Sequence, residues 1–187
     1  MQATESRESG FSLIELVVYA MLLVLVVGVA GSMVTGLINN TLRVTALNQA
    51  TSVGQLAIDS IDSSIRNSSD FQLTSPSGTD QLLIARAAST SGPLSWGCVA
   101  WYYSAAGAGS IRSMRSTAPI LPPTATELAT WTLLDDGVQP LTGTTIFSTT
   151  ARQVTVSFTS AAGNQTPVGI TSAALSRAGA SGAVSCF

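Results

Sequence analysis

The chain has 187 residues and a net charge of −2, and its ten acidic residues face eight arginines with no lysine and no histidine. These absences exclude a histidine general base, a Ser-His-Asp triad, a histidine metal ligand and a Schiff-base lysine. Two cysteines alone do not form a four-ligand zinc site, and no basic block is present to attract nucleic acid. We therefore expect a protein that is not an enzyme and that binds no metal or cofactor.

The N-terminal segment combines a short polar leader with a long apolar run. Residues 1–10, MQATESRESG, are polar and end in glycine, and the run from 11 to 34 carries a single charge, at Glu15. At about 1.5 Å per residue that run forms a helix of roughly 36 Å, which is long enough to cross a bilayer. We expect a transmembrane helix over residues 11–36.

The helical pattern continues beyond the apolar run. Apolar residues recur at three- and four-residue spacing on one side and polar residues lie on the other, which predicts an amphipathic continuation over residues 37–69. We expect one helix from about Phe11 to about Arg66, ended by Asn67-Ser-Ser-Asp. The apolar positions that define its second half are Leu47, Ala50, Val53, Ala57, Ile58, Ile61 and Ile65.

Residues 70–187 have the pattern of a β-rich head. Hydrophobic residues alternate with polar ones, and the intervening turns are rich in Gly, Ser and Pro. We expect an α+β fold in which the long N-terminal helix packs on an antiparallel β-sheet. A long loop over 119–140 should hold a short strand near Trp131–Leu134, and CVAWYYS should form a hairpin with SIRSMRS. The predicted strands are Gln81–Arg86, Cys98–Ser104, Ser110–Arg115, Thr144–Thr149, Gln153–Thr159 and Gly169–Ser176.

The charge of Glu15 within the apolar run helps to distinguish between interpretations of the N-terminus. A secretory signal would need a basic leader and a shorter apolar core, whereas this leader holds Glu5 and Glu8 against Arg7. An uncleaved membrane anchor fits the length but leaves Glu15 unexplained, because a carboxylate at membrane depth costs about 2.5–3.5 kcal/mol. A snorkelling carboxylate near the membrane surface is one alternative. Removal of the leader after Gly10 is another, since it would give Phe11 a free α-amine whose positive charge can offset the charge of a Glu15 carboxylate.

The stretch GFSLIELVV resembles the class III signal of type IV prepilins and pseudopilins. The resemblance implies cleavage by prepilin peptidase between Gly10 and Phe11, and N-methylation of Phe11. It also implies that Glu15 is an assembly residue, whose carboxylate pairs with the amine of Phe11 in a neighbouring subunit. The leader departs from the family, in which it is usually basic.

The remaining sequence resembles more loosely the larger minor pilins of the PilW-like group and the J-type pseudopilins. The stretches that carry this likeness are IDSIDSSIRNSSDF, VAWYYSAAGAGSIRSMRS, LLDDGVQPL and RQVTVSFT. The resemblance implies a subunit of a type IV pilus-like filament or its tip complex. Its partners would be other pilin or pseudopilin subunits, prepilin peptidase, the inner-membrane assembly platform and, before assembly, membrane lipid.

The same resemblance implies a bacterial precursor that crosses the cytoplasmic membrane once, with its head outside, and later lies in a cell-surface filament. Cys98 and Cys186 would then lie where disulfides persist, and they form either a disulfide or two buried thiols. DNA is a possible partner but is not indicated, because residues 44–187 hold six arginines and seven acids. Two other interpretations are a membrane-anchored binding protein that never assembles and a cell-envelope enzyme with an Asp/Glu site.

Overall fold

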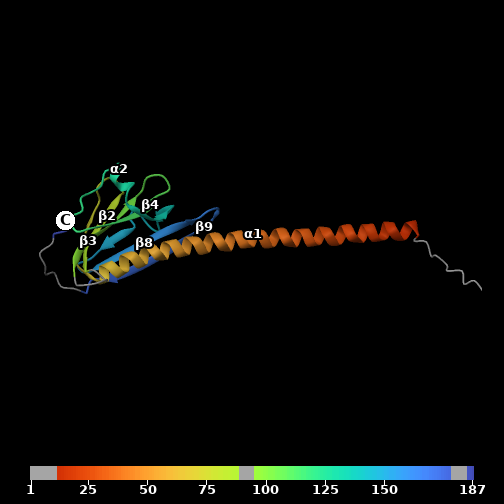
Figure 1. Cartoon of the computed structure of the whole chain (residues 1–187), viewed down its shortest axis with the longest axis horizontal. Helices are drawn as coiled ribbons and strands as arrows, with labels where there is room; N and C mark the ends of the chain where they lie inside the picture. The colour runs from red at the N-terminus through yellow and green to blue at the C-terminus, as the bar shows by residue number, and fades with distance from the viewer. Residues whose placement is uncertain (1–11, 89–94, 178–184) are drawn as a thin grey trace, which may run out of the picture. The chain divides into compact units, whose positions relative to one another are not determined.

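A computed structural model describes residues 12–88, 95–177 and 185–187. The leader, with Gly10 and with Phe11 after it, lies outside the described residues. The chain divides into two compact units between Val44 and Thr45, and each unit is considered by itself. One helix, α1 (Leu13–Arg66), contributes to both units (Figure 1).

The first unit is the apolar part of α1. The side chains of residues 12–45 are exposed, with the exception of the half-buried Glu15. Such a helix has no polar face to turn toward water, so it is stable only in lipid or against other apolar surfaces. This part of α1 is long and apolar enough to cross a membrane, which agrees with a single-pass membrane anchor.

The second unit begins with residues 45–66 of α1. The buried positions recur every three or four residues, so they form one stripe along the helix. At Gly54 a Cβ atom would collide with Cδ1 of Ile170 and lie 3.6 Å from Cε2 of Phe158, so glycine lets the helix approach its neighbours closely. The buried residues are Ala50, Gly54, Ala57, Ile58, Ile61, Ser64 and Ile65.

The first sheet has five antiparallel strands in chain order, so each strand pairs with the next one along the sequence. A turn near Gly109 joins the strand Trp96–Ser104 to the strand Ser110–Ser116. There φ is +82° and a Cβ atom would meet the carbonyl oxygen of Val138, so the position requires glycine. The strands are β1 (Ser68–Thr74), β2 (Gln81–Ala88), β3 (Trp96–Ser104), β4 (Ser110–Ser116) and β5 (Thr132–Asp136). A four-residue helix, α2 (Ala125–Leu128), precedes β5.

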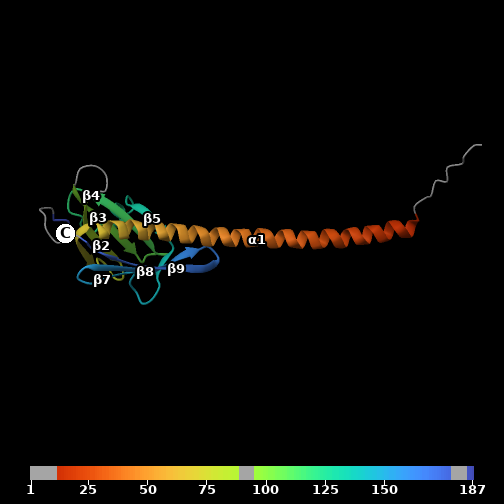
Figure 2. The same ribbon diagram turned by 90° about the horizontal axis from the view of Figure 1, so that it is seen from below.

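The second sheet is built around β8 (Gln153–Ala162), the strand with which its other three strands pair (Figure 2). The short strands β6 and β7 pair with β8 along one edge, and β9 pairs with it along the other, all antiparallel. Val154, Val156 and Phe158 alternate with exposed or half-buried polar residues, so one face of β8 is buried. The four strands are β6 (Val138–Pro140), β7 (Phe147–Thr149), β8 (Gln153–Ala162) and β9 (Gln165–Leu175).

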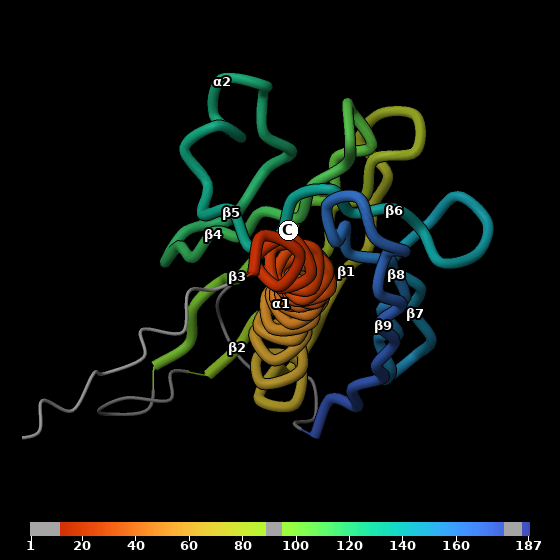
Figure 3. The backbone as a smooth tube through the Cα atoms, turned by 90° about the vertical axis from the view of Figure 1, so that its right-hand side faces the viewer, coloured from red at the N-terminus to blue at the C-terminus, as the bar shows by residue number. Residues whose placement is uncertain are grey.

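The main hydrophobic core lies where residues 45–66 of α1 meet both sheets. Figure 3, viewed along the helix, shows β2–β5 on one side of it and β7–β9 on the other. Ile61 and Ile65 of the helix, Trp101 of β3 and Phe158 of β8 are all fully buried in this core. The predicted packing of the helix on antiparallel sheet structure is confirmed.

A second, smaller core covers the opposite face of the first sheet. Ile120 and Trp131, from the segment before β5, and Cys186, near the C-terminus, pack there on strands β2 and β3. Because both faces are covered, β2 is buried along nearly its whole length, and its sequence QLLIARAA is apolar except for Gln81 and Arg86.

Six predicted strands correspond to β2, β3, β4, β7, β8 and β9, and the hairpin of β3 and β4 is confirmed. The helix ends at Arg66 as expected, but no strand was predicted over residues 68–74, which form β1 on the edge of the first sheet. The expected loop over 119–140 contains α2, β5 and β6, and its short strand lies at Thr132–Asp136. β7 begins only at Phe147, three residues later than predicted, and the amide of Ile146 before it donates to the side chain of Gln81.

Candidate functional site

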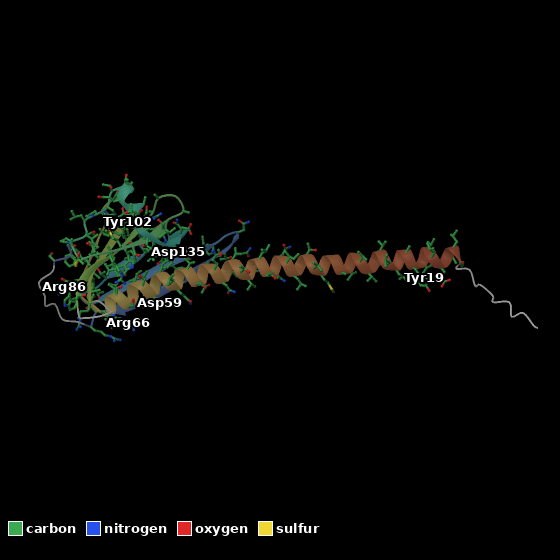
Figure 4. The ribbon with its side chains drawn as sticks, viewed as in Figure 1. Tyr19, Asp59, Arg66, Arg86, Tyr102 and Asp135 are labelled. Carbon is green, nitrogen blue, oxygen red and sulfur yellow. A yellow bond between two sulfur atoms is a disulfide. The ribbon has the colours of Figure 1, made fainter. Side chains whose placement is uncertain are left out.

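Glu15 lies in the first turn of α1 and is the single carboxylate of the apolar unit that the structure describes. The phenolic hydroxyl of Tyr19, one turn further along, donates a hydrogen bond to Glu15 Oε1 at 3.1 Å. Figure 4 labels Tyr19 on this part of the helix. The carboxylate therefore has a donor from its own helix, although the surrounding side chains are apolar.

The position of Glu15 on the helix also favours a negative charge. Unpaired N–H groups give the N-terminus of a helix a partial positive charge, worth about 0.3–1 kcal/mol to an exposed anion. That stabilisation is smaller than the cost of about 2.5–3.5 kcal/mol for a carboxylate at membrane depth. Glu15 thus remains an unfavourable residue for a simple anchor.

Three other hydroxyl groups of the apolar unit, those of Ser32, Thr35 and Thr41, are satisfied within the helix. Ser32 donates to the carbonyl of Val29 at 2.8 Å, and Thr35 donates to the carbonyl of Gly31 at 2.6 Å. Thr41 bonds in the same way one turn back, at 2.9 Å. These side chains need no partner outside the helix, and among residues 13–31 Glu15 is the one charged group.

Cys98 and Cys186 form a disulfide with a Cα–Cα distance of 5.5 Å, so the second of the two alternatives, buried free thiols, is wrong. The bond joins β3 to the C-terminal segment across 88 positions. The carbonyl of Cys186 also accepts a hydrogen bond from the amide of Ile120 at 3.1 Å. The disulfide thus fixes the tail over the second core.

Most arginines of the head have partners within the head. Arg86 is buried, lies 5.1 Å from the ring centroid of Trp96 and donates to the hydroxyl of Ser69. Other guanidinium groups bond to main-chain carbonyls of the head: Arg112 to Trp131 at 3.1 Å, and Arg152 to Ser176 at 2.9 Å. These arginines therefore serve the fold, and they do not form a free basic surface.

The conspicuous aromatic side chains also belong to the fold. Trp101 and Tyr103 are fully buried in the main core, and the indole N–H of Trp101 donates to the hydroxyl of Ser60 at 3.3 Å. Tyr102 packs edge-on against Trp131 in the second core. Burial, together with a hydrogen bond from its hydroxyl to Asp80, raises the pKa of Tyr102 to about 12.

The head has open cavities, and one of them is lined by acidic residues. A cavity of about 240 Å³ is bordered by Gln49 of α1, Asp135 and Asp136 of β5 and Ser160 of β8. Burial raises the pKa of Asp135, and a hydrogen bond with Ser160 acts against this shift. Within the described ranges, no three His, Cys, Asp or Glu side chains are grouped so that they could hold a metal ion.

The sequence analysis singled out Glu15 but missed Tyr19. A donor four residues after an acceptor on a helix lies on the same face, so this spacing was the signal that could have revealed the pair. Gly10 and Phe11, the predicted cleavage pair, lie outside the described residues. Comparison of the chain with protein-family models, with curated proteins and with solved structures finds no match.

Proposed function

We propose that this chain is a non-catalytic minor pilin or pseudopilin subunit. It is made as a membrane precursor, cleaved by prepilin peptidase after Gly10, and assembled into a type IV pilus-like filament or its tip complex. The observation that carries the proposal is the position of Glu15, a carboxylate in the first turn of α1 and within the otherwise apolar segment 11–34. Cleavage after Gly10 would create an amine at Phe11, four residues away.

The physical argument concerns two charges that are each costly in lipid. A charged amine and a charged carboxylate offset part of each other's desolvation when they come together. Within a filament, the amine of one subunit would meet Glu15 of its neighbour, and the exposed apolar surface of α1 would pack against other helices. A membrane anchor that never assembles would gain nothing from the carboxylate.

The architecture of the head is consistent with this role. Its long helix carries one stripe that packs on both sheets, and its tail is held by a disulfide that persists outside the cytoplasm. The arginines and aromatic residues that could have served a ligand are used in packing and internal hydrogen bonds. We therefore favour a structural subunit over a cell-envelope enzyme or a nucleic-acid-binding protein.

The mature N-terminus tests the proposal directly. Mass spectrometry of the protein from the membrane of the cells that produce it should find a chain that begins at Phe11, with an additional methyl group on its amine. Gly10→Val should retain the leader, because a bulky residue replaces glycine at the cleavage site, whereas Gly28→Val serves as a control that changes a glycine elsewhere. A chain that begins at Met1, or at a residue well after Phe11, would contradict the proposal.

A further inference from the structure

The geometry points to Tyr19 as a positioning residue for Glu15, an inference that rests on the proposed function and deepens it. The hydroxyl of Tyr19 donates a hydrogen bond to one oxygen of the Glu15 carboxylate and holds it along the helix surface. The remaining lone pairs of the carboxylate stay available to an amine. Tyr19 would thus hold the Glu15 side chain in one orientation before the subunit is assembled.

The first observation is the contact itself. The Tyr19 hydroxyl donates to Glu15 Oε1 at 3.1 Å, across four residues of one helix. On a helix, long side chains lean toward the N-terminus and cover the turn that precedes them. Tyr19 is therefore placed over Glu15 by helix geometry alone, without any contribution from the head.

The second observation is that Tyr19 has no competitor within residues 13–31 of α1, since the nearby hydroxyl of Ser12 precedes the helix. From residue 13 to residue 31 the sequence contains no other side chain with an N–H or O–H donor. Glu15 is also the one residue between 12 and 44 that is half-buried, whereas the others are exposed. In an apolar environment, Tyr19 is thus the side-chain donor of its own helix that can reach the carboxylate.

The chemistry of the carboxylate allows both interactions together. A carboxylate has about four lone-pair sites, and the bond from Tyr19 engages one of them at Oε1. An ammonium group has three donors and could bond to the remaining sites. Tyr19 therefore limits the rotation of the Glu15 side chain without blocking the approach of an amine.

The reactivity of Glu15 in the membrane tests the inference without requiring a filament. A hydrophobic carbodiimide adds to the carboxyl group and rearranges to a stable acylurea, which mass spectrometry detects as the added mass of the reagent. The full chain is treated in membrane vesicles, and Glu15→Gln identifies the modified position. Tyr19→Phe keeps the ring and removes only the hydroxyl, so Oε1 loses its donor.

We expect Tyr19→Phe to be modified about two- to ten-fold faster than the original chain, the range that corresponds to the net effect of one hydrogen bond. Thr35→Val is the matched control, because its hydroxyl bonds to the carbonyl of Gly31 and does not contact Glu15. It should react at the original rate. Equal rates for Tyr19→Phe and the original chain would overturn the inference.

Incorporation into filaments separates a failure of the inference from a failure of the proposed function. Tyr19→Phe should lower the ratio of filament to membrane subunit about two- to ten-fold, and it should have no further effect when added to Glu15→Gln. Loss with Glu15→Gln but not with Tyr19→Phe would reject the role of Tyr19 alone. Normal incorporation of Glu15→Gln would instead reject the proposed function of Glu15.

Discussion

The side-chain amide of Gln81 pairs with the backbone of Phe147 as a neighbouring strand would. Nε2 of Gln81 donates to the carbonyl of Phe147 at 2.9 Å, and Oε1 accepts from the amide of Phe147 at 2.9 Å and from that of Ile146 at 2.7 Å. Gln81 begins β2 of the first sheet and is only 3% exposed, whereas Phe147 begins β7 of the second. One buried side chain thus links the two sheets.

The first prediction concerns this link. Gln81→Leu removes three hydrogen bonds and leaves buried amide groups of Ile146 and Phe147 without a partner, so it should lower the free energy of unfolding of the head by about 2–4 kcal/mol. Gln139→Leu is the matched control, because Gln139 is exposed and its side chain donates one hydrogen bond, to the carbonyl of Ala108. Urea unfolding measures both. A similar loss in the two variants would contradict the special role of Gln81.

The second prediction concerns the division of α1. A fragment of residues 45–187 keeps the helix stripe that covers both sheets and removes the apolar part, so it should be soluble, monomeric and folded. A fragment of residues 67–187 lacks Ile61 and Ile65 and exposes the main core, and it should aggregate. Light scattering and circular dichroism distinguish the two. An insoluble longer fragment would show that the head needs the apolar unit.

The third prediction concerns the disulfide between Cys98 and Cys186. Cross-linking two positions 88 residues apart restricts the unfolded chain, and the chain-entropy model gives a stabilisation on the order of 4–5 kcal/mol. Cys98→Ser, Cys186→Ser and the double variant should lose similar stability, because either single change breaks the same bond. Thermal unfolding of the soluble fragment with and without reductant measures the loss. Additive losses in the double variant would contradict this account.

The fourth prediction concerns pH and Asp135, which is 3% exposed and whose pKa is raised by burial. In the described structure its Oδ2 is buried without a hydrogen-bond partner. The Asp135 carboxyl therefore holds its proton more tightly in the folded state than in the unfolded chain. Its contribution to the free energy of unfolding is fully present below pH 3.8 and is lost as pH rises through the raised pKa of the folded state. Asp135→Asn should thus be more stable than the original head at pH 7, and the difference should vanish near pH 3.

Asp80 provides the control for that pH series. Its two oxygens accept hydrogen bonds from the Tyr102 hydroxyl and from the amide of Ala105, both at 2.8 Å. Asp80→Asn would turn an amide group toward one of these donors, so it should lower stability at pH 7. If Asp135→Asn also lowered stability at pH 7, the inference that the buried, charged Asp135 carboxylate destabilises the head would be wrong.

The residues explain how far the sequence predicts this fold. The stripe of α1 and the alternation along β8 depend on local periodicity, and both could be recognised from the sequence. Strand β1 could not, because Ser68, Ser69 and Asp70 favour a turn and become a strand only through pairing with β2. The role of Gln81 depends on a partner 66 positions away, which no local pattern encodes. At the candidate site, Glu15 was recognisable as an anomaly in an apolar run, whereas Tyr19 required the geometry of the helix.

The last prediction concerns Glu15 itself. If it is only a carboxylate near the membrane surface, Glu15→Val should insert better and change little else, because an apolar side chain costs less in lipid. If it pairs with the amine of Phe11 in a neighbouring subunit, its removal leaves that amine uncompensated in an apolar setting, which typically costs about 3–5 kcal/mol. We therefore expect Glu15→Val to be inserted and cleaved normally but to be almost absent from filaments.

Two further variants sharpen this test. Glu15→Asp keeps the charge on a shorter side chain, so its incorporation should fall between those of the original chain and Glu15→Val. Asp59→Ala removes a carboxylate from the exposed face of α1 within the head, where water solvates it, and should be incorporated normally. The measurement is the amount of subunit in sheared filaments relative to the membrane pool. Undiminished incorporation of Glu15→Val would mean that the carboxylate has no part in assembly, because the amine of Phe11 would then be accommodated without it.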